Sequence, residues 1–188
     1  MKVLSDSRRY GLIAMTLHWA IGALAVFMLW FGRHMVDLPK GSFERLQAFQ
    51  LHKSIGISIL LLTLVRIGWR LYNRGPNPPA SLKGWELWLM KTVHYWFYIL
   101  LLLIPLSGWI MSSASPLRIP IEPYGLFRWP FFPGVPANEA VFNLFKEAHE
   151  FLGNGMIVLI GLHLLGVLKH TFITKDSVLK RMLPWKNA

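Results

Sequence analysis

Residues 149–170 read HEFLGNGMIVLIGLHLLGVLKH, a largely apolar run that carries three histidines. On an α-helix, the 14 residues from His149 to His163 cover about 21 Å and leave both side chains within roughly 40° of one face. A bilayer core of about 30 Å needs roughly 20 such residues. The stretch therefore predicts a membrane-spanning helix that presents two histidines to a bundle interior, one near each surface.

Three further uncharged runs precede this stretch, at Tyr10–Gly32, Ser54–Val65 and Thr92–Leu117. The second reaches a spanning length when it is extended to residues 48–72. The first is too long for a cleaved signal peptide and lacks a small-x-small cleavage site. The 188 residues are therefore expected to form one all-α integral membrane domain, a four-helix up-down bundle. Its helices are predicted at about residues 10–32, 48–72, 92–114 and 146–170.

The composition narrows the chemistry. Hydrophobic residues make up 54% of the chain, which is too apolar for a soluble domain of this size. The formal charge of +11 could suggest nucleic acid, but the cations lie between long apolar runs, which is typical of a membrane protein. The absence of cysteine excludes disulfides, Cys-ligated iron–sulfur clusters and covalent attachment of a c-type haem. Any haem must therefore be held non-covalently.

The distribution of cations predicts the orientation. Four spans place both termini on one side of the bilayer, and thirteen cations fall there: Lys2, Arg8, Arg9, Arg66, Arg70, Arg74, Lys83, Lys91, Lys169, Lys175, Lys180, Arg181 and Lys186. The other side has seven: Arg33, Lys40, Arg45, Lys53, Arg118, Arg128 and Lys146. By the positive-inside rule both termini are cytoplasmic, and in a bacterium the membrane would be the inner one.

Four histidines sort into two pairs by depth. His18 and His163 lie nine and six residues inside their helix boundaries, about 10 Å from the cytoplasmic surface. His52 and His149 lie near the opposite surface, next to charged residues. Ionisable residues within spans usually mark function, and bundles commonly build cofactor sites from facing helices. The pairing predicts two stacked b-type haems, each ligated by two histidines.

Glycines accompany three of these histidines at a spacing of four residues: Gly22, Gly56 and Gly153. Each places a position without a side chain one turn away on the same face, where a porphyrin could lie against the backbone. Two alternatives remain. A membrane histidine can be a packing residue, and glycine is common in membrane helices. Zinc is the weaker metal reading, because pairs of histidines without Cys or carboxylate make a poor tetrahedral site.

At these residues the chain resembles the bacterial cytochrome b561 family. The matching pieces occur in order along nearly the whole chain: Leu17-His18-Trp19, Leu51-His52-Lys53-Ser54-Ile55-Gly56, His94 with Tyr98, Pro105 and Gly108, His149-Glu150, Gly161-Leu162-His163, Lys169-His170, Lys175-Asp176, and Leu179 with Arg181-Met182. The resemblance implies a di-haem b cytochrome, and the chain looks most like the branch that contains superoxide oxidase. Such proteins oxidise superoxide at the outer surface and reduce ubiquinone in the membrane.

The resemblance suggests roles for residues outside the haem ligands. Lys53, Arg45 and Arg118 on the outer side are expected to attract the superoxide anion, although each could instead bind phospholipid or a haem propionate. At the cytoplasmic boundary His170 is expected to hydrogen-bond the quinone and supply a proton. His94 and Lys169 are expected to line the same quinone site, with an interfacial snorkelling role as the alternative for Lys169.

Two other functions remain open at this point. An electron-transfer subunit, passing electrons between quinone and a separate dehydrogenase or periplasmic redox protein, would have the same helices and haems. In that case the outer cations would dock an acidic partner. A haem-free transport or structural bundle would leave the paired histidine depths without a purpose. No nucleic-acid partner is expected.

Overall fold

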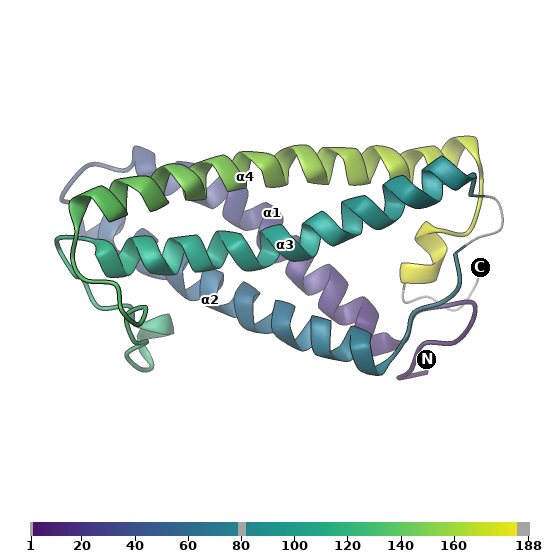
Figure 1. The fold of residues 1–188 in the computed structure, drawn as a ribbon, viewed down its shortest axis with the longest axis horizontal. Coiled ribbons are helices and arrows are strands. Elements are labelled where there is room, and N and C mark those ends of the chain that lie inside the picture. Colours follow the sequence, from purple (N-terminus) through teal and green to yellow (C-terminus); the bar gives the residue numbers. More distant parts are fainter. Residues whose placement is uncertain (1, 79–81, 184–188) are drawn as a thin grey trace.

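The computed structural model describes residues 2–78 and 82–183, and these form a helical bundle without a β-strand (Figure 1). Its long helices are α1 (Leu12–Asp37), α2 (Phe43–Tyr72), α3 (Gly84–Ala114) and α4 (Glu139–Leu168). Each is long and apolar enough to cross a membrane. The predicted four-helix membrane bundle is therefore confirmed. Lys186, counted among the cations above, lies outside the described residues.

The chain runs up and down the bundle. The first and last described residues and the α2–α3 connection lie at one end, which we call the terminal end (Figure 1). The opposite end, here the loop end, has the short α1–α2 connection and the longer segment 115–138 between α3 and α4. The closest helix pairs are α3 with α4, α1 with α2, and α2 with α3.

Two helices begin earlier at the loop end than the apolar runs predict. α2 starts at Phe43 because the Ser42 side chain accepts a hydrogen bond from the Arg45 N–H (3.1 Å). α4 starts at Glu139 because the Asn138 side chain accepts one from the Val141 N–H (3.0 Å). The polar first turn of each helix lies before its apolar run. Hydropathy alone therefore predicted the first residue of each helix too far along the chain, at about residues 48 and 146.

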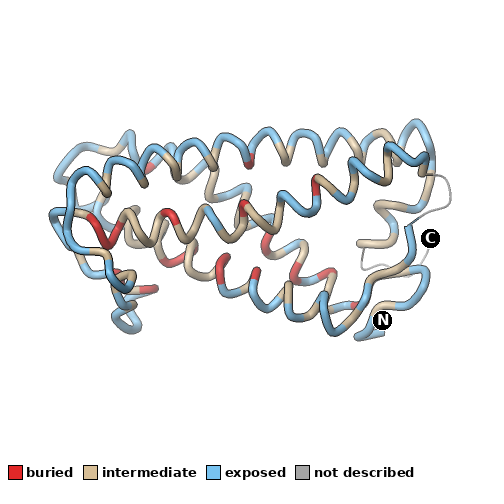
Figure 2. Tube along the Cα trace, in the orientation of Figure 1, coloured by how far each residue is buried: buried red, intermediate tan, exposed pale blue. Residues whose placement is uncertain are grey.

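Burial is uneven across the bundle. Buried side chains gather on α2 and α3, whereas α4 has a single buried residue, Met156 (Figure 2). Many large apolar side chains on α4 are exposed, among them Val158, Leu164 and Leu165. A surface of this kind suits contact with lipid. α4 is thus mainly a lipid-facing helix that nevertheless carries two of the predicted ligands.

Both ends of the bundle are covered by short segments. At the loop end the 3₁₀ turn Pro123–Gly125 packs on α2, where the Tyr124 N–H donates to the Ser54 hydroxyl (3.0 Å). At the terminal end α4 continues into a π-helical turn, Lys169–Ile173, and the chain folds back through the 3₁₀ turn Leu179–Met182. There the Trp19 indole on α1 donates to the Met182 carbonyl (2.7 Å).

Candidate haem sites

The loop end brings His52 of α2 and His149 of α4 together, with ring centroids 6.1 Å apart. The His149 ring is fixed by α3. Its Nδ1 lies 2.9 Å from the Ile104 carbonyl, which only accepts, so Nδ1 carries the proton. The Ser107 hydroxyl, 3.0 Å from Nδ1, donates to the same carbonyl. In the neutral ring Nε2 then keeps its lone pair, as a metal ligand requires.

Two glycines let these rings approach the neighbouring helices. A Cβ added at Gly108 on α3 would lie 3.1 Å from Cε1 of His149, and one at Gly32 on α1 would lie 3.2 Å from Cε1 of His52. Both distances are shorter than ordinary van der Waals contact. Sequence reasoning gave neither residue a role, and Gly108 entered only as part of the family resemblance, because both face a histidine on another helix and not one on their own.

The terminal end brings three histidines together. The His163 ring of α4 lies 6.3 Å from His18 of α1 and 5.4 Å from His94 of α3, measured between centroids. His94 donates from Nδ1 to the Met90 carbonyl (2.7 Å), so its Nε2 also keeps a lone pair. His94 was predicted near the start of its helix, but α3 begins at Gly84 and carries it well inside the bundle. It is a neighbour of the ligand pair as well as a candidate for the quinone site.

Arg66 is the main surprise at the terminal end. Counted above only as a cation of this side, it lies within α2, half-buried, with its Nη2 3.1 Å from His18 Nδ1. Its Nε donates to the Tyr98 hydroxyl (3.4 Å), and its guanidinium lies 5.9 Å from the Tyr98 ring centre. An arginine inside a span usually marks a functional site. Its position six residues before the end of the helix was the available signal.

The glycines that follow the histidines have free space beside them. A Cβ at Gly22 or Gly153 would meet nothing within 4 Å, and one at Gly56 would meet only the tip of Met28, at 3.9 Å. A planar group could therefore lie against these positions without moving the backbone. Their predicted contact with porphyrin stays a prediction.

The donor set fits a b-type haem. Each histidine pair is spaced so that one metal ion, with bonds of about 2 Å to a nitrogen of each ring, can sit between them. Within residues 2–78 and 82–183, no three or more His, Asp or Glu side chains converge as a closed metal centre. A metal held by two histidines takes its other ligands from elsewhere, and a porphyrin supplies four. His52 also has a buried Nδ1 for which the described part of the chain offers no hydrogen-bond partner.

The cations predicted to attract superoxide all lie at the loop end, but they differ in their contacts. Arg45 donates to the carbonyls of Val36 (3.0 Å) and Leu38 (2.6 Å), which closes the end of α1. Arg118 lies over the Phe131 ring, 4.6 Å from its centre, on a backbone with positive φ. Lys53 is half-buried on α2 beside His52. The structure thus places all three at one end, each with different neighbours.

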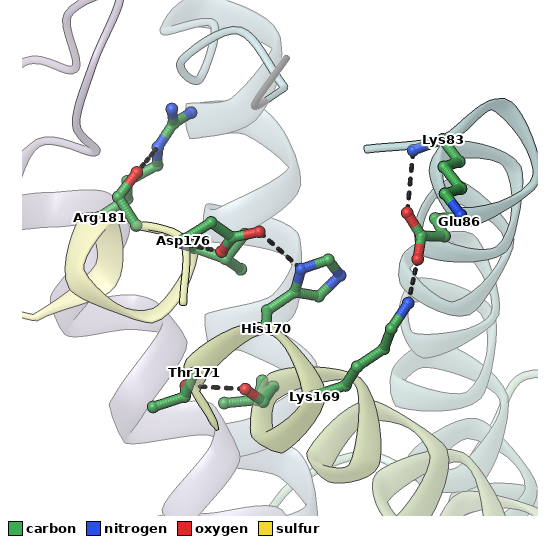
Figure 3. Close-up of polar contacts among 10 residues, drawn as sticks. Lys83, Glu86, Lys169, His170, Thr171, Asp176 and Arg181 are labelled. Atoms are coloured by element: carbon green, nitrogen blue, oxygen red, sulfur yellow. Dashed lines mark hydrogen bonds and ion pairs between the residues drawn. The ribbon is translucent and has the colours of Figure 1, made fainter. Parts of the chain in front are cut away.

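The residues predicted to bind quinone form two contacts at the terminal end (Figure 3). His170, in the π turn, pairs through Nδ1 with the Asp176 carboxylate at 2.7 Å, and both side chains are nearly buried. The Asp176 N–H donates back to the His170 carbonyl (3.0 Å), which fixes the turn between them. Lys169 forms an ion pair with Glu86 at the start of α3 and lies over the Trp85 ring. Lys169 therefore ties α4 to α3.

Comparison with known proteins identifies the family. Residues 9–185 match the family model described as prokaryotic cytochrome b561. The chain is 32% identical to cytochrome b561 homolog 2 of Escherichia coli (strain K12), over 97% of this chain and 95% of that protein. It is 29% identical to the probable superoxide oxidase CybB of Yersinia pestis, over 96% and 99% of the two chains. The chain therefore belongs to the prokaryotic cytochrome b561 family, whose members are membrane electron-transfer proteins that bind haem b.

Proposed function

We propose that this protein carries electrons from superoxide at its loop end to ubiquinone at its terminal end. Two b-type haems would serve the transfer, one held by His52 with His149 and the other by His18 with His163. The observation that carries the proposal is a histidine pair at each end of one bundle. The similarity to a Yersinia pestis protein named a probable superoxide oxidase supports the choice of donor.

The overall reaction balances without a further reactant. Each of two superoxide ions loses one electron and leaves as O₂, while ubiquinone takes up the two electrons and two protons to become ubiquinol. Bound haem supplies the one-electron chemistry, and its potential depends on its axial ligands and on nearby charges. The protein has to bring the anion to one end, hold the ligands, and deliver protons at the other.

Attraction of superoxide at the loop end has to be local. This end has seven cations but also six carboxylates: Asp37, Glu44, Glu122, Glu139, Glu147 and Glu150. Arg128 pairs with Glu122 (3.1 Å) and Lys146 with Glu150 (4.0 Å), so these two cations are largely neutralised. Arg45, by contrast, bonds neutral carbonyls and keeps its charge. We therefore assign the attraction to Lys53, Arg45 and Arg118, acting within about one Debye length.

Proton delivery at the terminal end is assigned to His170. Its Nδ1 is held by Asp176, which leaves Nε2 for a quinone oxygen. Lys169 and His94 would line the same site. The placement of the thirteen cations supports cytoplasmic termini in the inner membrane, so the protons would come from the cytoplasm.

The decisive experiment is stopped-flow spectroscopy of the purified protein mixed with superoxide, with and without ubiquinone. We expect both haems to be reduced rapidly after mixing with superoxide, and to be reoxidised when ubiquinone is also present. A protein that ignores superoxide but is rapidly reduced by ubiquinol would overturn the proposal.

A second function has support from other observations. The loop-end cations come from several segments, among them α2, the segment 115–138 and α4. They could equally form a docking surface for an acidic redox protein. An electron-transfer subunit would keep the same haem sites but need a protein partner for rapid reduction or oxidation.

A further inference from the structure

A cluster of hydrogen-bond donors lies beside the terminal-end histidines. It surrounds a cavity of about 20 Å³, room for roughly one water molecule. Its polar lining residues are Arg66, Trp69 and Arg70 of α2, Asn73 just after α2, Tyr98 of α3, and Tyr10 just before α1. We call this group the arginine cluster.

Among the described residues, the two positive charges of the cluster have no anionic partner. Arg66 contacts the Tyr98 hydroxyl and His18 Nδ1, and Arg70 contacts the Tyr10 hydroxyl at 3.4 Å. Within the described part of the chain, no carboxylate pairs with either guanidinium. The Trp69 indole N–H is buried and has no hydrogen-bond partner there. Two charges and an unused donor at the edge of a membrane protein call for an acceptor.

The bond between Arg66 and His18 is incompatible with metal binding by His18. Arginine only donates, so His18 Nδ1 must accept and Nε2 must carry the proton of the neutral ring. A metal bound at Nε2 requires the opposite tautomer, and a metal bound at Nδ1 takes the same lone pair. In either case a ligating His18 releases Arg66, which then needs a new acceptor within the half-buried site.

We infer that the arginine cluster is an anion site for a carboxylate of the prosthetic group bound by His18 and His163. This inference rests on the proposed haem at that pair. A carboxylate accepts two parallel bonds from a guanidinium, which Tyr98 and His18 cannot do. The phosphate of a phospholipid at the membrane surface shares this chemistry and is the competing source of the anion.

The inference predicts a change in one of the two midpoint potentials. Arg66→Gln should lower the potential of the haem that His18→Ala removes, because a carboxylate without its cation stabilises the oxidised iron. We expect at least a tenfold change in the reduction equilibrium, about 59 mV for one electron. Arg74→Gln is the matched control, since Arg74 is an exposed arginine at the same end that does not line the cavity.

Reconstitution with haem dimethyl ester, whose carboxylates are blocked, identifies the anion. If the cluster holds a haem carboxylate, the ester itself should raise the potential in the unsubstituted protein, because it removes negative charge beside the iron. The shift caused by Arg66→Gln should also become smaller with the ester, because the ester no longer holds the Arg66 guanidinium at the haem edge. A shift of equal size with haem b and with the ester would assign the anion to lipid phosphate and overturn the inference. No shift in either case would also overturn it. Spectra with two six-coordinate haems and no response to superoxide would instead refute the proposed function alone.

Discussion

The tautomers of three histidines in the bundle, His18, His94 and His149, are set by their neighbours. Backbone carbonyls hold the protons of His94 and His149 on Nδ1, whereas Arg66 requires His18 to accept at that atom. His52 has no partner for Nδ1 among the described residues. The rings that seem equivalent in sequence therefore differ in their readiness to bind a metal, which makes substitutions at single residues informative.

Substitution of the terminal-end histidines tests the pairing. We expect His18→Ala and His163→Ala to change the spectrum of the same haem, because each would remove one of the two histidines proposed to hold it. His94→Ala should leave both haems six-coordinate, since His94 is placed as a neighbour of His163 and not as its partner. Low-temperature spectra and electron paramagnetic resonance report the spin state. Loss of that haem in His94→Ala but not in His18→Ala would reverse the assignment.

Gly108→Ala tests the close approach at the loop end. The added methyl would lie 3.1 Å from Cε1 and 3.3 Å from Nδ1 of His149, so the ring must shift away from Ile104 and Ser107. Loss of such supporting contacts typically weakens metal binding by about 10–100-fold. We expect the loop-end haem to be lost selectively in titrations of haem content. Gly155→Ala on α4 is the control, because its methyl meets nothing within 4 Å.

At the scale of elements, the π turn at the end of α4 decides the geometry of the proposed quinone site. The turn Lys169–Ile173 departs from α-helical geometry and lets His170 meet Asp176 six residues later (Figure 3). Such π turns occur frequently at functional sites. The same turn leaves Lys169 directed to Glu86 on α3. This π turn thus directs His170, the candidate proton donor, to Asp176, and Lys169, which joins α4 to α3, to Glu86.

His170→Ala should slow ubiquinone reduction by about 10²–10⁴-fold, the usual effect of removing a proton donor. Reduction of both haems by superoxide should be unchanged, because it occurs at the other end. Asp176→Asn should slow the same step less, since the amide oxygen can still accept from Nδ1 and hold the ring in place. Asp6→Asn, an exposed change at the terminal end, serves as control. Equal turnover in all four proteins would remove His170 from the reaction.

At the scale of the whole molecule, the two ends of the bundle differ in charge. Among the described residues, the terminal end has twelve cations against the three carboxylates Asp6, Glu86 and Asp176, whereas the loop end is nearly balanced, with seven cations and six carboxylates. The histidine pairs lie at opposite ends of α4, 14 residues apart. Between His149 and His163, α4 is apolar and mostly exposed. Electron transfer between the two ends would therefore depend on the groups bound at the histidine pairs.

Two haems per chain are therefore expected in fully loaded protein. Both should be extracted by acidic acetone, because a chain without cysteine cannot hold them through thioethers. The pyridine haemochrome assay measures the stoichiometry. A single haem in a preparation that is saturated with haem would contradict the assignment of a ligand pair to each end.

Salt dependence separates a small anionic donor from a protein partner. The rate of haem reduction by superoxide should fall as ionic strength rises, since exposed charges are screened beyond about 10 Å at 0.1 M. Lys53→Glu and Arg118→Glu should slow this step without changing haem content, and reduction by uncharged ubiquinol should stay the same. Lys2→Glu at the other end is the matched control. Equal rates in Lys53→Glu and Lys2→Glu would favour docking of a protein partner.

The sequence alone determined the fold class and both histidine pairs. A membrane helix satisfies its backbone hydrogen bonds within about 20 consecutive apolar residues. Hydropathy therefore identifies such a helix without any knowledge of the helices that pack against it. Depth follows from a fixed rise per residue, so His18 could be matched with His163 and His52 with His149 before any packing was known.

Only the tertiary structure decided which helices touch these histidines. Gly108 and Arg66 lie 41 and 48 positions from the histidines they contact, and no periodicity within one helix connects them. The same holds for Lys169 with Glu86, an ion pair across 83 positions. Helix rotation and crossing depend on side-chain packing between helices, which a hydropathy pattern does not encode. For that reason the positions and partners of Arg66 and His94 emerged only from the assembled bundle.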